Sequence, residues 1–179
     1  MSRVLIMYFT KYGSTKKYAS WLAEELNGDI FPINKVKQQD LSNYETIILG
    51  SALYAGSIKG VDLLVKNYEQ IKGKKIVIFT CGLADYSKPE NMDTIRKRLE
   101  TIIPKELFDC IKLFCLRGGI DYQKLNVPHK LLMGMLNRMM KKKKPAQISE
   151  ESKIFRETYG KSIDFTGKDN LKGIIDYCK

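Results

Sequence analysis

Short apolar runs alternate along this chain with longer segments whose apolar residues recur every three or four positions. The first run, Val4–Phe9, contains only apolar residues and predicts a buried strand. After Thr15 the apolar residues recur at helical spacing as far as Leu26, and Asn27 with Gly28 forms a helix-ending signal. The start of the chain therefore predicts a strand that leads directly into an amphipathic helix.

The same alternation continues through the next two thirds of the chain. Strands are predicted at 30–33, 46–50, 74–82 and 110–119, and helices at 60–71 and 89–103. Strands that are apolar on both faces and separated by helices are typical of a parallel sheet covered on both sides. The pattern predicts the α/β class, with a three-layer, doubly wound, five-stranded parallel sheet.

The alternation stops after the fifth predicted strand. Residues 128–144 have helical spacing and end in a basic run, a polar stretch follows at 145–152, and a closing helix is predicted over 168–178. No repeat or low-complexity linker divides the chain. We interpret residues 119–162, approximately, as an insertion within a single domain that spans residues 1–179.

Hydropathy and cysteine spacing predict a cytoplasmic protein. No segment approaches the roughly 20 apolar residues of a membrane span, and the apolar run near the amino terminus is too short for a signal peptide. The four cysteines, at 81, 110, 115 and 178, form no C-x-x-C pair, and the chain has one histidine, His129. Reduced structural thiols are therefore expected, and no metal site is predicted.

The formal net charge is +11, from 31 basic and 20 acidic residues, and it restricts the choice of partner. Anionic lipid, acidic small molecules, acidic proteins and nucleic acid all suit a positive field. Aromatic residues are not interleaved with the basic run near 141–144, as a base-stacking platform requires, so nucleic acid is the least favoured of these partners.

A polar stretch, Thr10–Thr15, separates the first predicted strand from its helix. Free backbone N–H groups and the positive end of a helix meet at such a turn, and both favour an anion. A simple N-cap explains one hydroxyl residue, whereas this stretch has three hydroxyl residues and Gly13, which permits close approach. The absence of Walker and G-x-G-x-x-G patterns disfavours nucleoside triphosphates and dinucleotides.

The sequence YFTKYGSTKKYA, residues 8–19, resembles the flavodoxin phosphate loop, T-x-[ST]-G-x-T, with Thr10, Gly13 and Thr15 in register. The resemblance extends to the order of elements over nearly the whole chain and to the late insertion of long-chain flavodoxins. Tyr12 departs from the pattern, because flavodoxins usually have a small hydroxyl residue there. This departure and the basic insertion are closer to the flavodoxin-like menaquinone-dependent protoporphyrinogen dehydrogenases and their uncharacterised relatives.

The resemblance implies a flavodoxin-like fold with FMN outside the carboxyl ends of the strands, at the switch in strand order. The phosphate would lie on the Thr10–Thr15 loop. The flavin ring would lie between the loops that follow the third and fourth strands, with Leu53 or Tyr54 against its face. The implied cofactor-binding residues are Thr10, Lys11, Tyr12, Gly13, Ser14, Thr15, Ser51, Ala52, Leu53, Tyr54, Ala55, Gly56, Thr80, Cys81, Gly82, Leu83, Ala84, Asp85, Gly118 and Gly119.

The predicted helix at 129–144 leaves two interpretations open. It ends in Lys141–Lys144 and places five apolar residues on one face, namely Leu132, Met135, Leu136, Met139 and Met140. Either this face packs on the sheet, or the helix contacts an anionic membrane or a quinone, since a basic amphipathic helix favours anionic lipid. His129 is expected at the surface or as a cap.

These observations predict an FMN-binding, flavodoxin-fold oxidoreductase that acts with a redox partner or on an anionic small molecule. Protoporphyrinogen with a quinone is the pair that the resemblance implies. Flavodoxin electron carriers are typically acidic, whereas this chain is basic, and this difference favours an enzyme. Two alternatives remain open: an electron-transfer protein that docks acidic redox proteins, and a flavin-free basic binding module.

Overall fold

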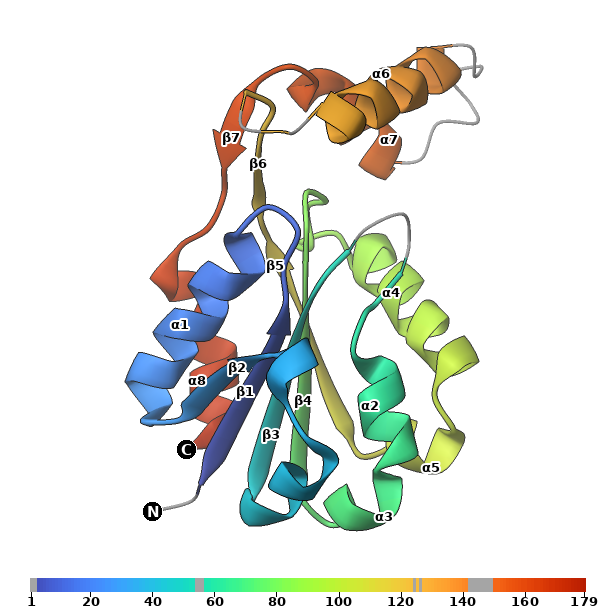
Figure 1. Ribbon diagram of the computed structural model, residues 1–179. Helices are drawn as coiled ribbons and strands as arrows, with labels where there is room; N and C mark the ends of the chain where they lie inside the picture. Colours follow the sequence, from blue (N-terminus) through green and yellow to red (C-terminus); the bar gives the residue numbers. More distant parts are fainter. Residues whose placement is uncertain (1–2, 54–56, 124, 126, 142–149) are drawn as a thin grey trace.

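The computed structural model describes residues 3–53, 57–123, 125, 127–141 and 150–179. Its centre is a five-stranded parallel sheet with the strand order β2-β1-β3-β4-β5 (Figure 1). The predicted α/β fold with a doubly wound sheet is confirmed. The strands are β1 (Val4–Phe9), β2 (Asp29–Pro32), β3 (Thr46–Ala52), β4 (Lys75–Gly82) and β5 (Ile111–Arg117).

Helices cover both faces of this sheet. Side chains from neighbouring positions of a strand point to opposite faces, so each strand contributes to two cores. Met7, Leu49 and Ile78 belong to one core, and Ile6, Ile48 and Val77 belong to the other. The first core lies under α2 (Val61–Lys66), α3 (Tyr68–Ile71), α4 (Pro89–Ile102) and α5 (Lys105–Phe108), and the second lies under α1 (Ser14–Leu26) and α8 (Lys172–Cys178) (Figure 1).

Two predicted helices are interrupted in the structure. The helix expected over 60–71 divides at Asn67, whose side-chain amide donates a 2.7 Å hydrogen bond to the Leu63 carbonyl and whose backbone leaves the helical region. The closing helix begins with a 3₁₀ turn, Lys168–Leu171. Short helical turns at Ile33–Lys35 and Gln38–Asn43, and the four-residue α5, were not predicted, because they are too short for a hydrophobic period.

The segment interpreted as an insertion stands beyond the carboxyl ends of the parallel strands (Figure 1). Its base is an antiparallel pair, β6 (Gly119–Asp121) with β7 (Ser162–Asp164), and these strands carry α6 (Val127–Lys141) and α7 (Glu150–Thr158). The prediction of a polar stretch over 145–152 missed the start of α7. Both chain termini lie at the opposite end of the sheet.

Gly50 leaves room for a buried aromatic ring, and this packing gives a stability prediction. A Cβ atom at Gly50 would lie 2.2 Å from the Phe79 ring, which is fully buried. We expect Gly50→Ala to lower the free energy of unfolding by about 1 to 3 kcal/mol, measured by urea denaturation, because the ring has no space to move. Gly134→Ala is the control, since the nearest atom there is the Tyr159 hydroxyl at 3.5 Å. Equal losses in the two variants would contradict this account.

Candidate functional site

The loop between β1 and α1 is shaped to receive an anion. Gly13 is the residue before the helix and has φ +92°, a left-handed conformation that favours glycine. The Thr10 hydroxyl accepts a 3.0 Å hydrogen bond from the Gly13 N–H and closes the loop. No side chain caps α1 and no acidic residue lies in its first turn. The positive helix end and its first N–H groups are therefore available to a negatively charged ligand.

Thr15, in the first turn of α1, has a buried hydroxyl. The residue is 1% exposed, and the oxygen has no oxygen or nitrogen partner within the described part of the chain. Its neighbour of hydrogen-bonding type is the Cys81 thiol, which is a weak partner, so the hydroxyl keeps the capacity to bond a stronger acceptor. Ser51 and Thr80, which are paired residues in the register of β3 and β4, also have buried hydroxyls. These groups can gain a hydrogen bond from a ligand, which fits a phosphate at Thr15.

Two other loop residues hold the insertion. The Ser14 hydroxyl accepts a 2.9 Å hydrogen bond from the Gly119 N–H and lies 3.3 Å from the Gly119 carbonyl, to which it donates. The Tyr12 ring contacts the His129 ring edge-on at 6.2 Å and packs against the small core of the insertion. That core consists of Ile120, Tyr122, Leu125 and Met133. The aromatic residue at position 12 therefore has a structural role between the loop and the insertion.

The two loops predicted to surround a flavin ring, after β3 and β4, meet the end of β5 at this edge of the sheet. The Leu53 N–H donates a 2.9 Å hydrogen bond to the Cys81 carbonyl, and the Gly118 N–H donates a 2.7 Å bond to the Gly82 carbonyl. A Cβ atom at Gly82 would lie 2.4 Å from the Tyr86 hydroxyl. The predicted residues Tyr54, Ala55 and Gly56 lie outside the described residues. Of the other predicted residues, Ala52, Lys11 and Leu83 are partly exposed and Ala84 is buried.

Cys81 is buried below Thr15 and Gly118. A Cβ atom at Gly118 would lie 2.8 Å from its sulfur, so only glycine fits there without displacement. Burial raises the pKa of the Cys81 thiol to about 12, although a hydrogen bond with Thr15 acts in the opposite direction. The thiol therefore stays protonated and unreactive at neutral pH. Within the described ranges, no group of histidine, cysteine or carboxylate side chains is arranged to hold a metal ion.

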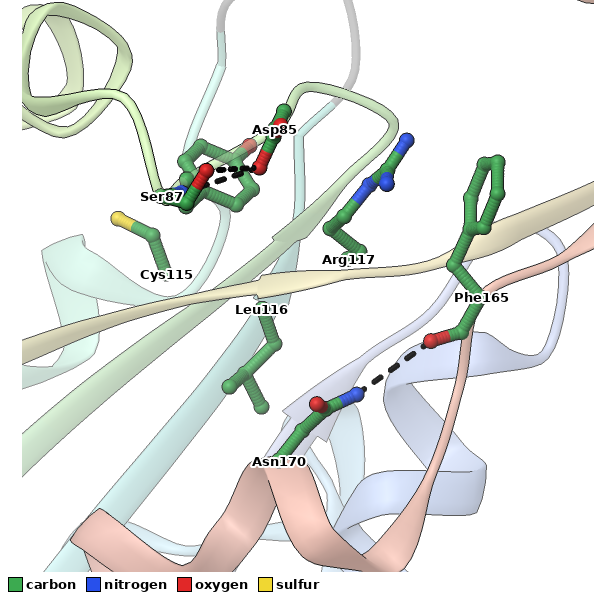
Figure 2. A pocket seen from close by; sticks show the side chains of 8 residues that line it. Asp85, Ser87, Cys115, Leu116, Arg117, Phe165 and Asn170 are labelled. Carbon is green, nitrogen blue, oxygen red and sulfur yellow. Dashed lines mark hydrogen bonds between the residues drawn. The ribbon is translucent and has the colours of Figure 1, made fainter.

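A cavity of about 460 Å³ lies along β5, next to the loop that follows β4 (Figure 2). The Asp85 carboxylate accepts hydrogen bonds from the Ser87 hydroxyl (2.8 Å) and N–H (3.1 Å). These bonds lower the pKa of the Asp85 carboxyl, and the positive charges of Arg117 and Lys88 contribute to the shift. The lining residues are Asp85, Tyr86, Ser87, Cys115, Leu116, Arg117, Phe165 and Asn170.

Arg117 was missed by the prediction from sequence. It is the last residue of β5, its guanidinium lies 3.8 Å from the centre of the Phe165 ring, and it donates a 3.5 Å hydrogen bond to the Leu83 carbonyl. The signal was present, because the carboxyl ends of parallel strands meet at one edge, where ligands bind. Arg117 lies near the carboxyl end of the fifth predicted strand, 110–119, so this position made it a candidate that the sequence analysis did not include.

The apolar residues of α6 are divided between two faces, so the predicted single face is wrong. Met133 is buried, and Leu136 packs on the core of the insertion. Another stripe faces solvent and consists of Val127 (70% exposed), Leu131 (70%), Met135 (55%) and Met139 (55%). The Met140 and Lys141 side chains and residues 142–144 lie outside the described parts. Among the described helices, none has the length and apolar content needed to cross a membrane.

Comparison with known proteins identifies several relatives. Residues 5–147 match the family described as a flavodoxin domain. An uncharacterised protein of Methanocaldococcus jannaschii is 28% identical over 122 residues, which cover 67% of this chain and 78% of that protein. A flavodoxin of Maridesulfovibrio salexigens is 28% identical over 126 residues, which cover 63% of this chain and 86% of that protein. Among solved structures, the two-electron reduced flavodoxin of Megasphaera elsdenii is 15% identical, with a TM-score of 0.46. The match covers 86% of this chain and 96% of that flavodoxin.

The protonated state of Cys81 gives a prediction about its reactivity. Near pH 8, iodoacetamide should modify the exposed Cys110 at least about 100-fold faster than Cys81, because burial excludes the reagent and keeps the Cys81 thiol neutral. Peptide mass spectrometry after timed labelling measures both rates. In guanidinium chloride the two rates should converge. Similar rates in the folded protein would show that Cys81 is accessible and ionised.

Proposed function

Because the chain belongs to the flavodoxin-domain family, we propose that it binds FMN at the carboxyl ends of its parallel strands and uses it for oxidation and reduction. The observation that supports this proposal most directly is the start of α1, where no side chain of the described residues caps the helix and the Thr15 hydroxyl is buried. A terminal phosphate satisfies both features. The bound flavin supplies the redox chemistry, which is the transfer of one or two electrons.

The loops around the site have separate tasks in this proposal. The Thr10–Thr15 loop binds the phosphate, and backbone groups of the loops after β3 and β4 position the ring. Gly82 and Gly118 keep these loops close together, since a side chain at either position would meet its neighbours. Tyr12 and Leu83 pack against the core of the insertion at this end of the sheet.

We infer that the protein is an oxidoreductase for an anionic small molecule. The formal charge of +11 supports this inference, because a positive field attracts acidic substrates. The resemblance to protoporphyrinogen dehydrogenases suggests protoporphyrinogen, with a quinone as electron acceptor. An electron carrier for acidic proteins is the second candidate, which the same charge supports. Turnover of protoporphyrinogen with menaquinone distinguishes the two, and a purified protein without a visible flavin spectrum after incubation with FMN would favour a basic binding module.

We also propose that α6 contacts an anionic membrane surface, where a quinone is found. The exposed stripe of Val127, Leu131, Met135 and Met139 lies on a helix that projects beyond the sheet. Lys130 and Arg138 are exposed on the same helix. An apolar stripe with flanking cations favours the interface of an anionic bilayer.

The phosphate site gives a prediction about ligand preference. Wild-type protein should bind FMN at least about tenfold more tightly than riboflavin, because only FMN has the phosphate. Thr15→Val should weaken FMN by about 1 to 3 kcal/mol and leave riboflavin affinity unchanged, as measured by flavin fluorescence titration. The fold should tolerate this change, since valine has nearly the shape of threonine and the neighbouring Cys81 thiol is only a weak hydrogen-bond partner.

Thr101→Val is the matched control for this experiment. Thr101 lies on α4, and its hydroxyl donates to the Arg98 carbonyl of the same helix. This variant should bind both flavins as the wild type does. Equal affinities of the wild type for FMN and riboflavin would contradict the phosphate site, and equal losses for both ligands in Thr15→Val would show an indirect effect on the ring.

The exposed stripe of α6 gives a prediction about membrane affinity. Met135→Glu should reduce co-sedimentation with phosphatidylglycerol vesicles about tenfold, because an apolar contact is lost. Met92→Glu is the control, since Met92 is 42% exposed on α4 and receives the same charge change. Binding of wild type should weaken as salt is added, because each cation near the surface contributes about 1 kcal/mol of attraction and salt screens that attraction. Equal effects of the two substitutions, or equal binding to neutral vesicles, would count against the membrane contact.

A further inference from the structure

The guanidinium of Arg117 lies directly behind the loop that follows β4. Its Nη2 donates to the Leu83 carbonyl at 3.5 Å, and its Nε is buried without a hydrogen-bond partner in the described part of the chain. The Phe165 ring lies 3.8 Å from the guanidinium carbon and limits its movement. Figure 2 shows the side chain projecting from the end of β5 toward the loop that carries Asp85.

This positive charge is not neutralised by a close ion pair. The ion pairs formed among the described residues do not include Arg117. Asp85, on the loop that follows β4, is the nearby acid, but its carboxylate accepts two hydrogen bonds from Ser87 and the residue is partly exposed to solvent. A partly buried cation without a paired carboxylate is costly, and such groups occur preferentially at functional sites.

We propose that Arg117 is a positioning and electrostatic residue that stabilises the reduced, negatively charged form of the flavin. This inference rests on the proposed function, because Leu83 and Asp85 belong to the loop that would border the ring. Oxidised FMN takes up two electrons and one proton to give the anionic reduced form, so reduction adds negative charge next to this loop. A nearby fixed cation lowers the free energy of that form more than the free energy of the oxidised form.

The other charges near this loop have opposite or weaker effects. Asp85 disfavours an added negative charge, although its exposure to solvent reduces the effect. Lys88 follows on the same segment and adds positive charge. Lys112, on the same strand as Arg117, is five residues earlier and therefore about 16 Å away along β5. That distance exceeds the Debye length of about 8 Å at physiological ionic strength, so Lys112 should have little influence.

The experiment compares the flavin potential in four single variants of the full chain loaded with FMN. The two-electron midpoint potential is measured by spectroelectrochemistry, with the electrode as reductant, and oxidised FMN affinity is measured by fluorescence titration. In Arg117→Gln, the affinity for reduced relative to oxidised FMN should fall about tenfold, which equals a potential about 30 mV lower. Arg117→Lys should keep most of the wild-type preference for reduced over oxidised FMN. Lys112→Gln should leave this preference within about threefold of wild type, and Asp85→Asn should increase it.

Each outcome separates this inference from the proposed function. A wild type that binds no FMN overturns the proposed function and the inference with it. A wild type that binds FMN, together with equal potentials in Arg117→Gln and Lys112→Gln, overturns the inference alone. If Arg117→Gln does not fold, as judged by circular dichroism, Arg117→Met, which is uncharged and of similar length, decides: a potential lower than that of Lys112→Gln supports the electrostatic role, and an equal or higher potential overturns it.

Discussion

All five strands of the sheet run in the same direction, and the rest of the structure depends on this constraint. Parallel strands need a helical crossover between them, so the helices must cover both faces and the strands must be apolar on both sides. The same constraint brings the carboxyl end of every strand to one edge. The loops after β1, β3, β4 and β5 therefore meet there, although they are distant in sequence. Backbone hydrogen bonds from Leu53 to Cys81 and from Gly118 to Gly82 connect them.

The loop after β1 has two roles that share its residues. Gly13 and Thr15 belong to the proposed anion site, whereas Ser14 binds Gly119 at the base of the insertion and Tyr12 packs on the insertion's core. Lys17, one turn further along α1, adds a 3.0 Å ion pair with Asp164 of β7. Alternate residues of one short loop thus belong to the proposed anion site and to the contact with the insertion. A substitution at Tyr12 or Ser14 is expected to affect both.

The fold was predictable because the central strands β1, β3 and β4 are largely apolar runs and the long helices α1 and α4 have a clear period. The break at Asn67 depends on one side-chain hydrogen bond, and β6 and β7 have three residues each, so no periodicity could indicate them. The two-sided apolar surface of α6 was misjudged, since spacing alone does not show which side has a packing partner. In the candidate site, glycines and hydroxyl residues had a recognisable spacing. Arg117 had none, because its position depends on the pairing of β5 with β4.

The strand order also has a consequence for behaviour at high concentration. It leaves β2 and β5 at the two edges of the sheet, where unpaired backbone groups are a template for another chain. β2 has only four residues and ends in Pro32, which lacks an N–H group, and β5 carries the exposed cation of Lys112 near its start. Short length, proline and positive charge all oppose pairing with the same edge of a second copy. The sheet is thus protected against self-association and fibrillar aggregation by residues that take no part in its core.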